Sequence, residues 1–248
     1  MDIDKVKCNF NIRQLSETEQ DIRNIFNNTT LVGVNKENIL KYLRAESVVN
    51  NTDEIIQLIK RNYNKEQNII EIKCKLLNER WEHYGNQIFD DLNSQLDLID
   101  KPFDYICKLH LLPLNIIDYE NNTIYLNCND DVDELFKTSV IMLSNIILLQ
   151  KYIQLQRYKF NTTFTNQNKV WMFVEIAVDA LFANSGLYEL YGCPSYKYFY
   201  NLQINNVNIM EQFRKLYKYI PLNDFLDKVY KFVRENYETI SKFKNFLY

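Results

Sequence analysis

The chain has 248 residues, 46% hydrophobic and 25% charged, which is the composition of a globular protein rather than a disordered or fibrous one. Only four residues are glycine, and this excludes the glycine-rich loops of P-loops and dinucleotide-binding folds. The net charge is −3, and Lys and Arg are interleaved with Asp and Glu, so we expect no nucleic-acid partner.

The composition is also biased toward the residues of A/T-rich codons. The chain contains 32 Asn, 26 Ile and 18 Tyr, against four Gly and four Pro. We attribute much of this excess to mutational bias in an A/T-rich genome. Residue types that such a bias supplies in excess are weak evidence for function, and tyrosine is the one whose chemistry we consider further.

The N-terminal segment carries no apolar core of the kind that a secretory signal needs. No stretch reaches the roughly 18 apolar residues of a membrane span. We therefore expect a protein that is not secreted and has no membrane partner.

The first third of the chain predicts helices. Ser16 and Glu19 form a capping box that predicts a helix to about Asn27, and a second helix is expected over 35–48. Thr52 begins a third helical segment.

From residue 70 to 99 apolar residues recur every three or four positions, which predicts one long amphipathic helix that Pro102 ends. Gly85 lies inside this pattern and suggests a bend. A short helix is expected over 103–111.

Residues 114–128 have a different pattern. The β-branched and aromatic segments LNIIDY and TIYLNC flank Glu120-Asn121-Asn122, which predicts a β-hairpin. We expect it to be the only strand pair of the chain.

Two helices that are apolar on nearly every face follow, one from a cap at 129–131 to about 160 and one over 170–183. Amphipathic helices are expected over 209–219 and 223–247, separated by Pro221.

The predicted fold is mainly α: a multi-helix globular bundle with two buried apolar helices and one small β-hairpin. Its expected parts are an N-terminal helical part with a terminal arm over 1–112, the hairpin over 113–128 and a C-terminal helical bundle over 129–248. No linker separates them, so they are expected to form one compact unit.

Two pairs of residues have a spacing that suits metal ligands on one helix face. Glu79 and His83 are four residues apart, and Cys107 and His110 are three apart. A surface ion pair and a structural Cys-His pair explain them better, because neither is a zincin or di-iron motif. We therefore predict no metal, no cofactor and no catalytic residue.

Two sets of acidic residues could pair carboxylates. The run Asp90, Asp91, Asp97 and Asp100 is interpreted as the solvated face of a helix. Glu175 and Asp179 lie four residues apart within an apolar helix, where burial would raise their pKa values and require partners.

The five cysteines form no C-x-x-C pair, which argues against a zinc ribbon or a thioredoxin-type site. One interpretation is five reduced and mostly buried thiols. The other is that Cys8, in a polar terminal arm, and Cys193, in a Gly-Cys-Pro turn, form disulfides between chains.

Tyrosines cluster toward the C-terminus. Codon bias and ordinary core use explain part of this excess, but tyrosine is also enriched at protein–protein contacts. The candidate contact residues are Tyr188, Tyr191, Tyr196, Tyr198, Tyr200, Tyr217, Tyr219 and Tyr248.

The codon bias, the unpaired thiols, the abundant tyrosine and the predicted helices together resemble the nudivirus occlusion-body protein, a polyhedrin-like matrix protein of viral crystals. The resemblance covers the overall character of the chain and rests on no motif. It implies a structural protein that assembles with itself in infected cells, in the nucleus or the cytoplasm. The lattice would encase virions, use disulfides and exchanged terminal arms, and dissolve at alkaline pH.

Two other functions stay open. One is a soluble viral helical module that binds a host protein, such as a host-defence antagonist. The other is an enzyme that uses His83 or His110, for which no third orienting group can be named.

Overall fold

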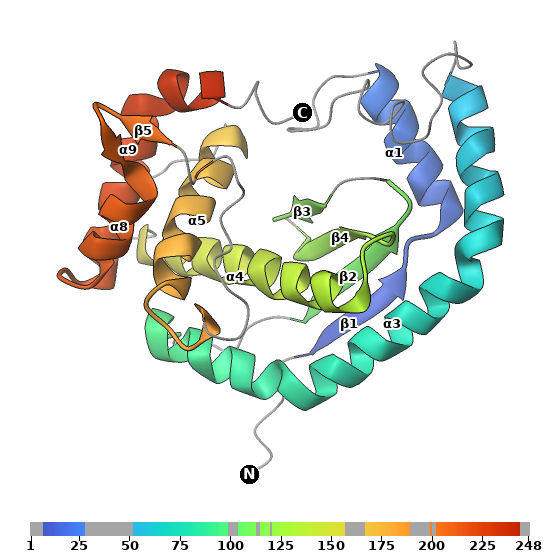
Figure 1. Cartoon of the computed structure of the whole chain (residues 1–248), viewed down its shortest axis with the longest axis horizontal. Coiled ribbons are helices and arrows are strands. Elements are labelled where there is room, and N and C mark those ends of the chain that lie inside the picture. Colours follow the sequence, from blue (N-terminus) through green and yellow to red (C-terminus); the bar gives the residue numbers. More distant parts are fainter. Residues whose placement is uncertain are drawn as a thin grey trace. The chain divides into compact units, whose positions relative to one another are not determined.

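A computed structural model describes residues 7–27, 52–98, 104–112, 115–119, 121–156, 167–188, 199 and 202–243. The chain forms two compact units. Unit 1 comprises residues 1–86 and 103–139, and unit 2 comprises residues 87–102 and 140–248. This division differs from the predicted parts, because the hairpin belongs to unit 1 and two long helices contribute residues to both units. Figure 1 shows the elements along the chain.

Unit 1 contains a four-stranded sheet with the order β1-β2-β4-β3. Strand β1 (Cys8–Ile12) pairs in parallel with β2 (Tyr105–His110), and β2 pairs in parallel with β4 (Thr123–Asn127). Strand β3 (Ile116–Asp118) lies antiparallel to β4. The sheet therefore joins segments that lie far apart in the sequence.

The predicted hairpin is confirmed as β3 and β4, but two related predictions are wrong. The segment expected as a helix over 103–111 is strand β2, and the hairpin is not the only strand pair. In β2 the residues Tyr105, Cys107 and Leu109 are buried on one face, which is the period of a strand. This segment forms a strand because it pairs with β1, which lies far away in the sequence, near the start of unit 1.

One face of the sheet forms the apolar core of unit 1. Partner residues of parallel strands point to the same face, so the buried positions of three strands gather there. They are Cys8, Phe10, Tyr105, Cys107, Leu109, Ile124 and Leu126.

Helix α3 (Thr52–Leu96) is a single helix of 45 residues, where two segments were expected, and its residues 52–86 belong to unit 1. It runs beside β1 (Figure 1), and Cys74, Leu77 and Trp81 are buried. Gly85 is explained by packing, since a Cβ there would lie 2.8 Å from Cε2 of the Trp81 ring. Trp81 in turn packs edge-on against Phe136.

Helix α1 (Leu15–Asn27) is confirmed, although its cap differs from the expected capping box. The Glu17 carboxylate accepts a hydrogen bond from the backbone N–H of Gln14. The residues that cap the helix are therefore Gln14 and Glu17, two positions before the expected Ser16 and Glu19. The helix expected over 35–48 lies outside the described residues.

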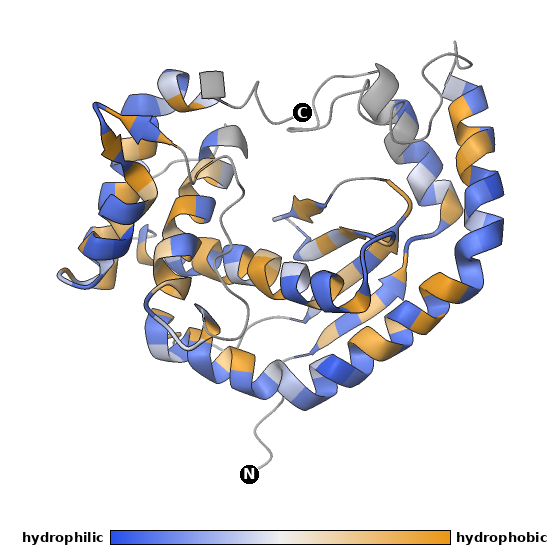
Figure 2. Cartoon of the chain, in the orientation of Figure 1, coloured by the Kyte–Doolittle hydropathy of each residue, from blue (hydrophilic) through white to orange (hydrophobic). Residues whose placement is uncertain are grey.

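Unit 2 contains most of α4 (Val132–Gln156) and all of α5 (Gln167–Phe182), which confirm the two buried apolar helices. Figure 2 shows long hydrophobic stretches along both. Helices α8 (Ile209–Tyr217) and α9 (Leu222–Phe243) are amphipathic and pack on α5. A two-stranded ribbon, β5 (Gln203–Ile204) and β6 (Val207–Asn208), precedes α8. The mainly α fold class is confirmed.

Candidate functional site

The most unusual chemistry of the molecule lies in the core of unit 2. Glu175 and Asp179 stand one turn apart on α5 and are 2% and 0% exposed. The expectation that they are buried and need partners is confirmed. Each carboxyl group has a different kind of partner.

Asp179 is held by an arginine. The Arg214 guanidinium, on α8, donates through Nε to Oδ2 at 2.7 Å and through Nη2 to Oδ1 at 2.9 Å. A two-point contact of this kind is stronger and geometrically more specific than a single charge-assisted hydrogen bond. It compensates the cost of burying the Asp179 charge and fixes α8 against α5.

Glu175 has an amide as its partner. Asn145, a fully buried residue of α4, donates from Nδ2 to Glu175 Oε1 at 2.8 Å. Burial, together with the charge of Asp179, raises the pKa of Glu175 to about 8 and outweighs the hydrogen bonds from Asn145 and Trp171, which lower this pKa. Glu175 is thus a mostly neutral acid at neutral pH.

The sequence predicted the two acids but neither partner. Asn145 could have been found, because Ser144-Asn145 interrupts an otherwise apolar run in the middle of α4. Arg214 carried no signal, since it is one of two adjacent basic residues on an amphipathic helix.

The thiols of unit 1 form a second buried group. Cys8, Cys74, Cys107 and Cys128 are free and buried, and the Sγ atoms of Cys8 and Cys107 lie 3.4 Å apart. Burial raises the pKa of the Cys74 thiol to about 11 and that of Cys128 to about 12, and it raises that of Cys107 well above its usual range. These three thiols are therefore protonated and poorly nucleophilic.

The expectation that Cys8 lies in a polar terminal arm is wrong. Cys8 begins β1 and is only 4% exposed, because the alternation of β1 turns its side chain into the core. A disulfide between chains through Cys8 requires unit 1 to open first. Cys193 lies outside the described residues.

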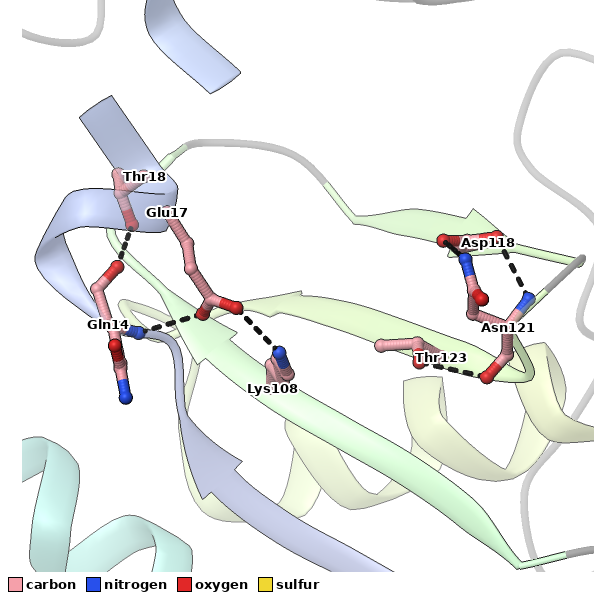
Figure 3. Close-up of polar contacts among 7 residues, drawn as sticks. All are labelled: Gln14, Glu17, Thr18, Lys108, Asp118, Asn121 and Thr123. Carbon is pink, nitrogen blue, oxygen red and sulfur yellow. Dashed lines mark hydrogen bonds and ion pairs between the residues drawn. The ribbon is translucent and has the colours of Figure 1, made fainter. Parts of the chain in front are cut away.

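Polar side chains occupy the other face of the sheet (Figure 3). Lys108 on β2 donates to Oε1 of Glu17 at 2.9 Å, and this ion pair joins the sheet to α1. At the hairpin, Asp118 accepts hydrogen bonds from the backbone and the side chain of Asn121. These contacts fix a helix start and a turn, so their role is structural.

The two histidine pairs do not form sites. Cys107 and His110 lie three residues apart on a strand, so their side chains point to opposite faces of the sheet. Glu79 forms an ion pair with Lys75, and His83 packs edge-on against Tyr84. Over the part of the chain that the structure describes, no three His, Cys, Asp or Glu side chains form a group that could hold a metal ion.

The acidic run at the end of α3 is largely solvated, as expected. Asp90 is exposed and Asp91 is half-buried on the helix, and Asp97, which follows its last residue, is exposed. Residue 100 lies outside the described ranges.

The candidate tyrosine contacts have different environments. Tyr188 is 49% exposed and Tyr219 is 81% exposed, so both are available to another molecule. Tyr217 is half-buried and donates to Gln95 Oε1 at 3.1 Å, which makes it an internal contact. The candidates outside the described residues are Tyr191, Tyr196, Tyr198, Tyr200 and Tyr248.

Helix α3 presents an apolar face to solvent. Ile69, Ile72 and Leu76 follow the helical spacing of three and four residues, and their exposed fractions are 49%, 59% and 41%. We call these three residues the α3 apolar face. The sequence pattern does not reveal this face, because the same helix segment also carries the buried stripe of Ile70, Cys74 and Leu77.

No family model, no curated protein and no solved structure matches the chain. Within the described ranges, each helix is too short or too polar to cross a bilayer.

Proposed function

We propose that the chain is a structural protein that acts by associating with copies of itself, as the matrix of a viral occlusion body does. The observation that supports this proposal best is the α3 apolar face. Large aliphatic side chains that are half exposed along one face of a helix are typical of surfaces that another protein covers. Covering each of them contributes on the order of 1 kcal/mol.

A lattice also needs more than one contact surface, because one self-complementary surface closes into a dimer. Unit 2 has its own exposed residues of the kind that proteins use at contacts, Tyr188 and Tyr219, together with Val207, which is 44% exposed. Contacts that are weak singly become strong when each copy makes several of them. This supports assembly beyond a dimer, with virions enclosed as the lattice grows.

The test changes one residue of the α3 apolar face. Ile72→Glu places a charge at its centre, and we expect it to reduce the size of the assemblies by about tenfold or more in sedimentation velocity over a concentration series. The matched control is Asn64→Glu, which adds the same charge to an exposed position on another side of the same helix. The control should assemble as the unchanged chain does.

Equal assembly of Ile72→Glu and the unchanged chain would contradict the role of the α3 apolar face. The resemblance further implies dissolution in alkali, and assemblies that persist above about pH 11, where exposed tyrosines are ionised, would contradict that part.

The same face also favours the second candidate function, a soluble module that binds a host protein. The spacing of its residues is that of an amphipathic helix that packs its apolar side chains against a groove or a helix of another protein. An unchanged chain that stays monomeric at the highest concentration of the series would support this alternative and exclude self-assembly.

A further inference from the structure

We propose that Glu175 is a proton-binding site in the core of unit 2, and that the stability which its bound proton gives this unit is lost as the pH rises from mildly acid to mildly alkaline values. The inference is independent of self-association, because every group it uses lies within one chain. It concerns a buried carboxyl group for which the proposed function has no use.

The first observation is the pairing of Glu175 with Asn145. The amide gives its Nδ2 donor to Glu175 Oε1, whereas Asn145 Oδ1 is buried and has no hydrogen-bond partner among the described residues. An ionised carboxylate can only accept hydrogen bonds, but a protonated carboxyl group also carries an O–H donor. The neutral acid therefore brings a donor into a core that has an unsatisfied acceptor.

The second observation is the set of charges around Glu175. On α5 itself the neighbouring charge is Asp179, which has the same sign as an ionised Glu175 and opposes it. From α8 comes Arg214, whose guanidinium donates to both oxygens of Asp179. This cation is thus bound to the other acid.

The remaining helices bring rings and polar groups. Helix α4 contributes the uncharged Asn145 and also Tyr152, which packs on Phe173. From α9, Tyr230 packs on Phe173 and Tyr152, and Asp227 accepts hydrogen bonds from Tyr152 and Gln156. These contacts place Asp227 and Tyr230 of α9 against Tyr152.

The consequence for folding follows from the direction of the shift. Burial raises the pKa of Glu175 to about 8, from 4.5 for an ordinary glutamate. The folded state then binds a proton that the unfolded state releases. The contribution of this proton to the free energy of unfolding is therefore fully present below about pH 4.5 and is lost as the pH rises to about 8. Between these limits the folding equilibrium constant should fall by about tenfold for each pH unit.

The experiment compares the full chain with Glu175→Gln, which keeps the shape of the neutral acid and cannot ionise. Both carry Trp81→Phe, so that Trp171, the other of the two tryptophans, reports on unit 2. Urea unfolding is measured from about pH 5 to about pH 8.5 at constant ionic strength. The control is Glu235→Gln, an exposed α9 residue whose change should leave the pH profile as it was.

We expect the ratio of the two folding constants, that of the chain with Glu175 divided by that of the Glu175→Gln variant, to fall by about a hundredfold or more between pH 5 and pH 8. A ratio that stays constant over this range would show that Glu175 is ionised in the folded chain, and would overturn the proposal.

A second measurement covers the case in which Glu175→Gln does not fold. The side-chain carboxyl carbons of glutamate are labelled with ¹³C in the unchanged chain and followed by NMR during a pH titration. One resonance should titrate close to pH 8. If every glutamate resonance titrates between about pH 3 and about pH 5.5, the proposal is wrong.

Discussion

The two units bury groups other than hydrocarbon in different ways. The core of unit 1 takes up four thiols, which are nearly apolar groups. The core of unit 2 takes up two carboxyl groups, one of them paired with a guanidinium. The difference determines where pH acts: a change of pH around neutrality acts on Glu175 in unit 2, whereas the buried thiols with raised pKa values in unit 1 stay protonated over the same range.

Each unit also contains its own tryptophan, Trp81 in unit 1 and Trp171 in unit 2. Variants that keep one of the two therefore read the units separately, and the contrast between them can be tested residue by residue.

The largest effect is expected from breaking the ion pair of unit 2. Arg214→Met leaves the Asp179 carboxylate buried without its cation, which should lower the free energy of unfolding by about 3–5 kcal/mol. Urea unfolding followed through Trp171 measures this loss. Lys215→Met, on the exposed side of the same helix, serves as the control and should cost less than about 0.5 kcal/mol.

Adding Asp179→Asn to Arg214→Met removes the unpaired charge and should restore part of the stability. If Arg214→Met and the control Lys215→Met lowered the free energy of unfolding equally, this would contradict the view that the ion pair stabilises the core of unit 2.

A smaller effect is expected in unit 1, at the edge of its sheet. Asn78 on α3 accepts a hydrogen bond from the Phe10 N–H and donates one to the Phe10 carbonyl, both at 3.0 Å, so its amide takes the place of a neighbouring strand. Asn78→Ala should cost about 1–3 kcal/mol and speed hydrogen exchange at Phe10.

Urea unfolding followed by Trp81 fluorescence measures the loss of unfolding free energy that Asn78→Ala causes. Asn64→Ala removes an amide from an exposed position of the same helix and should change neither measurement. Unchanged exchange at Phe10 in Asn78→Ala would show that the amide does not close this edge.

The smallest effect is expected at the ion pair between α1 and the sheet. Burial raises the pKa of Glu17, but hydrogen bonds from Lys108 and from the Gln14 backbone outweigh it, so the pKa is lowered overall. Its contribution is present above the ordinary value of 4.5 and is lost as the pH falls through the lowered one. Glu17→Gln should cost about 0.5 kcal/mol at neutral pH and nothing in strong acid.

Urea unfolding of the Glu17→Gln variant, followed by Trp81 fluorescence at neutral and at acid pH, measures this difference. Glu82→Gln, at an exposed position of α3, is the matched control. The same loss at both pH values would mean that Glu17 acts through packing rather than charge.

The buried apolar helices could be predicted from the sequence, because residues 142–149 of α4 and 172–182 of α5 are buried throughout and carry no competing pattern. The sheet could be predicted only in part. The alternation Cys8-Asn9-Phe10-Asn11-Ile12 is a strand signal. A single strand cannot be assigned to a sheet until its partner is known, and the partner of β1 is β2, which follows much later in the chain.

The candidate site was predictable to the same degree. The acids of α5 stand out against an apolar helix, whereas Arg214 acquires its role through the packing of α8 on α5. The polar residues beside Cys8 dominate the local composition and predict a polar terminal arm there. The period of two that turns Cys8 inward outweighs that composition.

The buried thiols of unit 1 have a kinetic consequence. A thiol reagent can reach Cys107 only in molecules whose sheet has transiently opened, so its labelling rate is the product of an opening equilibrium and the rate of an exposed thiol. Cys8 and Cys74 are buried on β1 and α3 of the same unit. The order in which a reagent modifies these cysteines therefore records the order in which strand and helix come away.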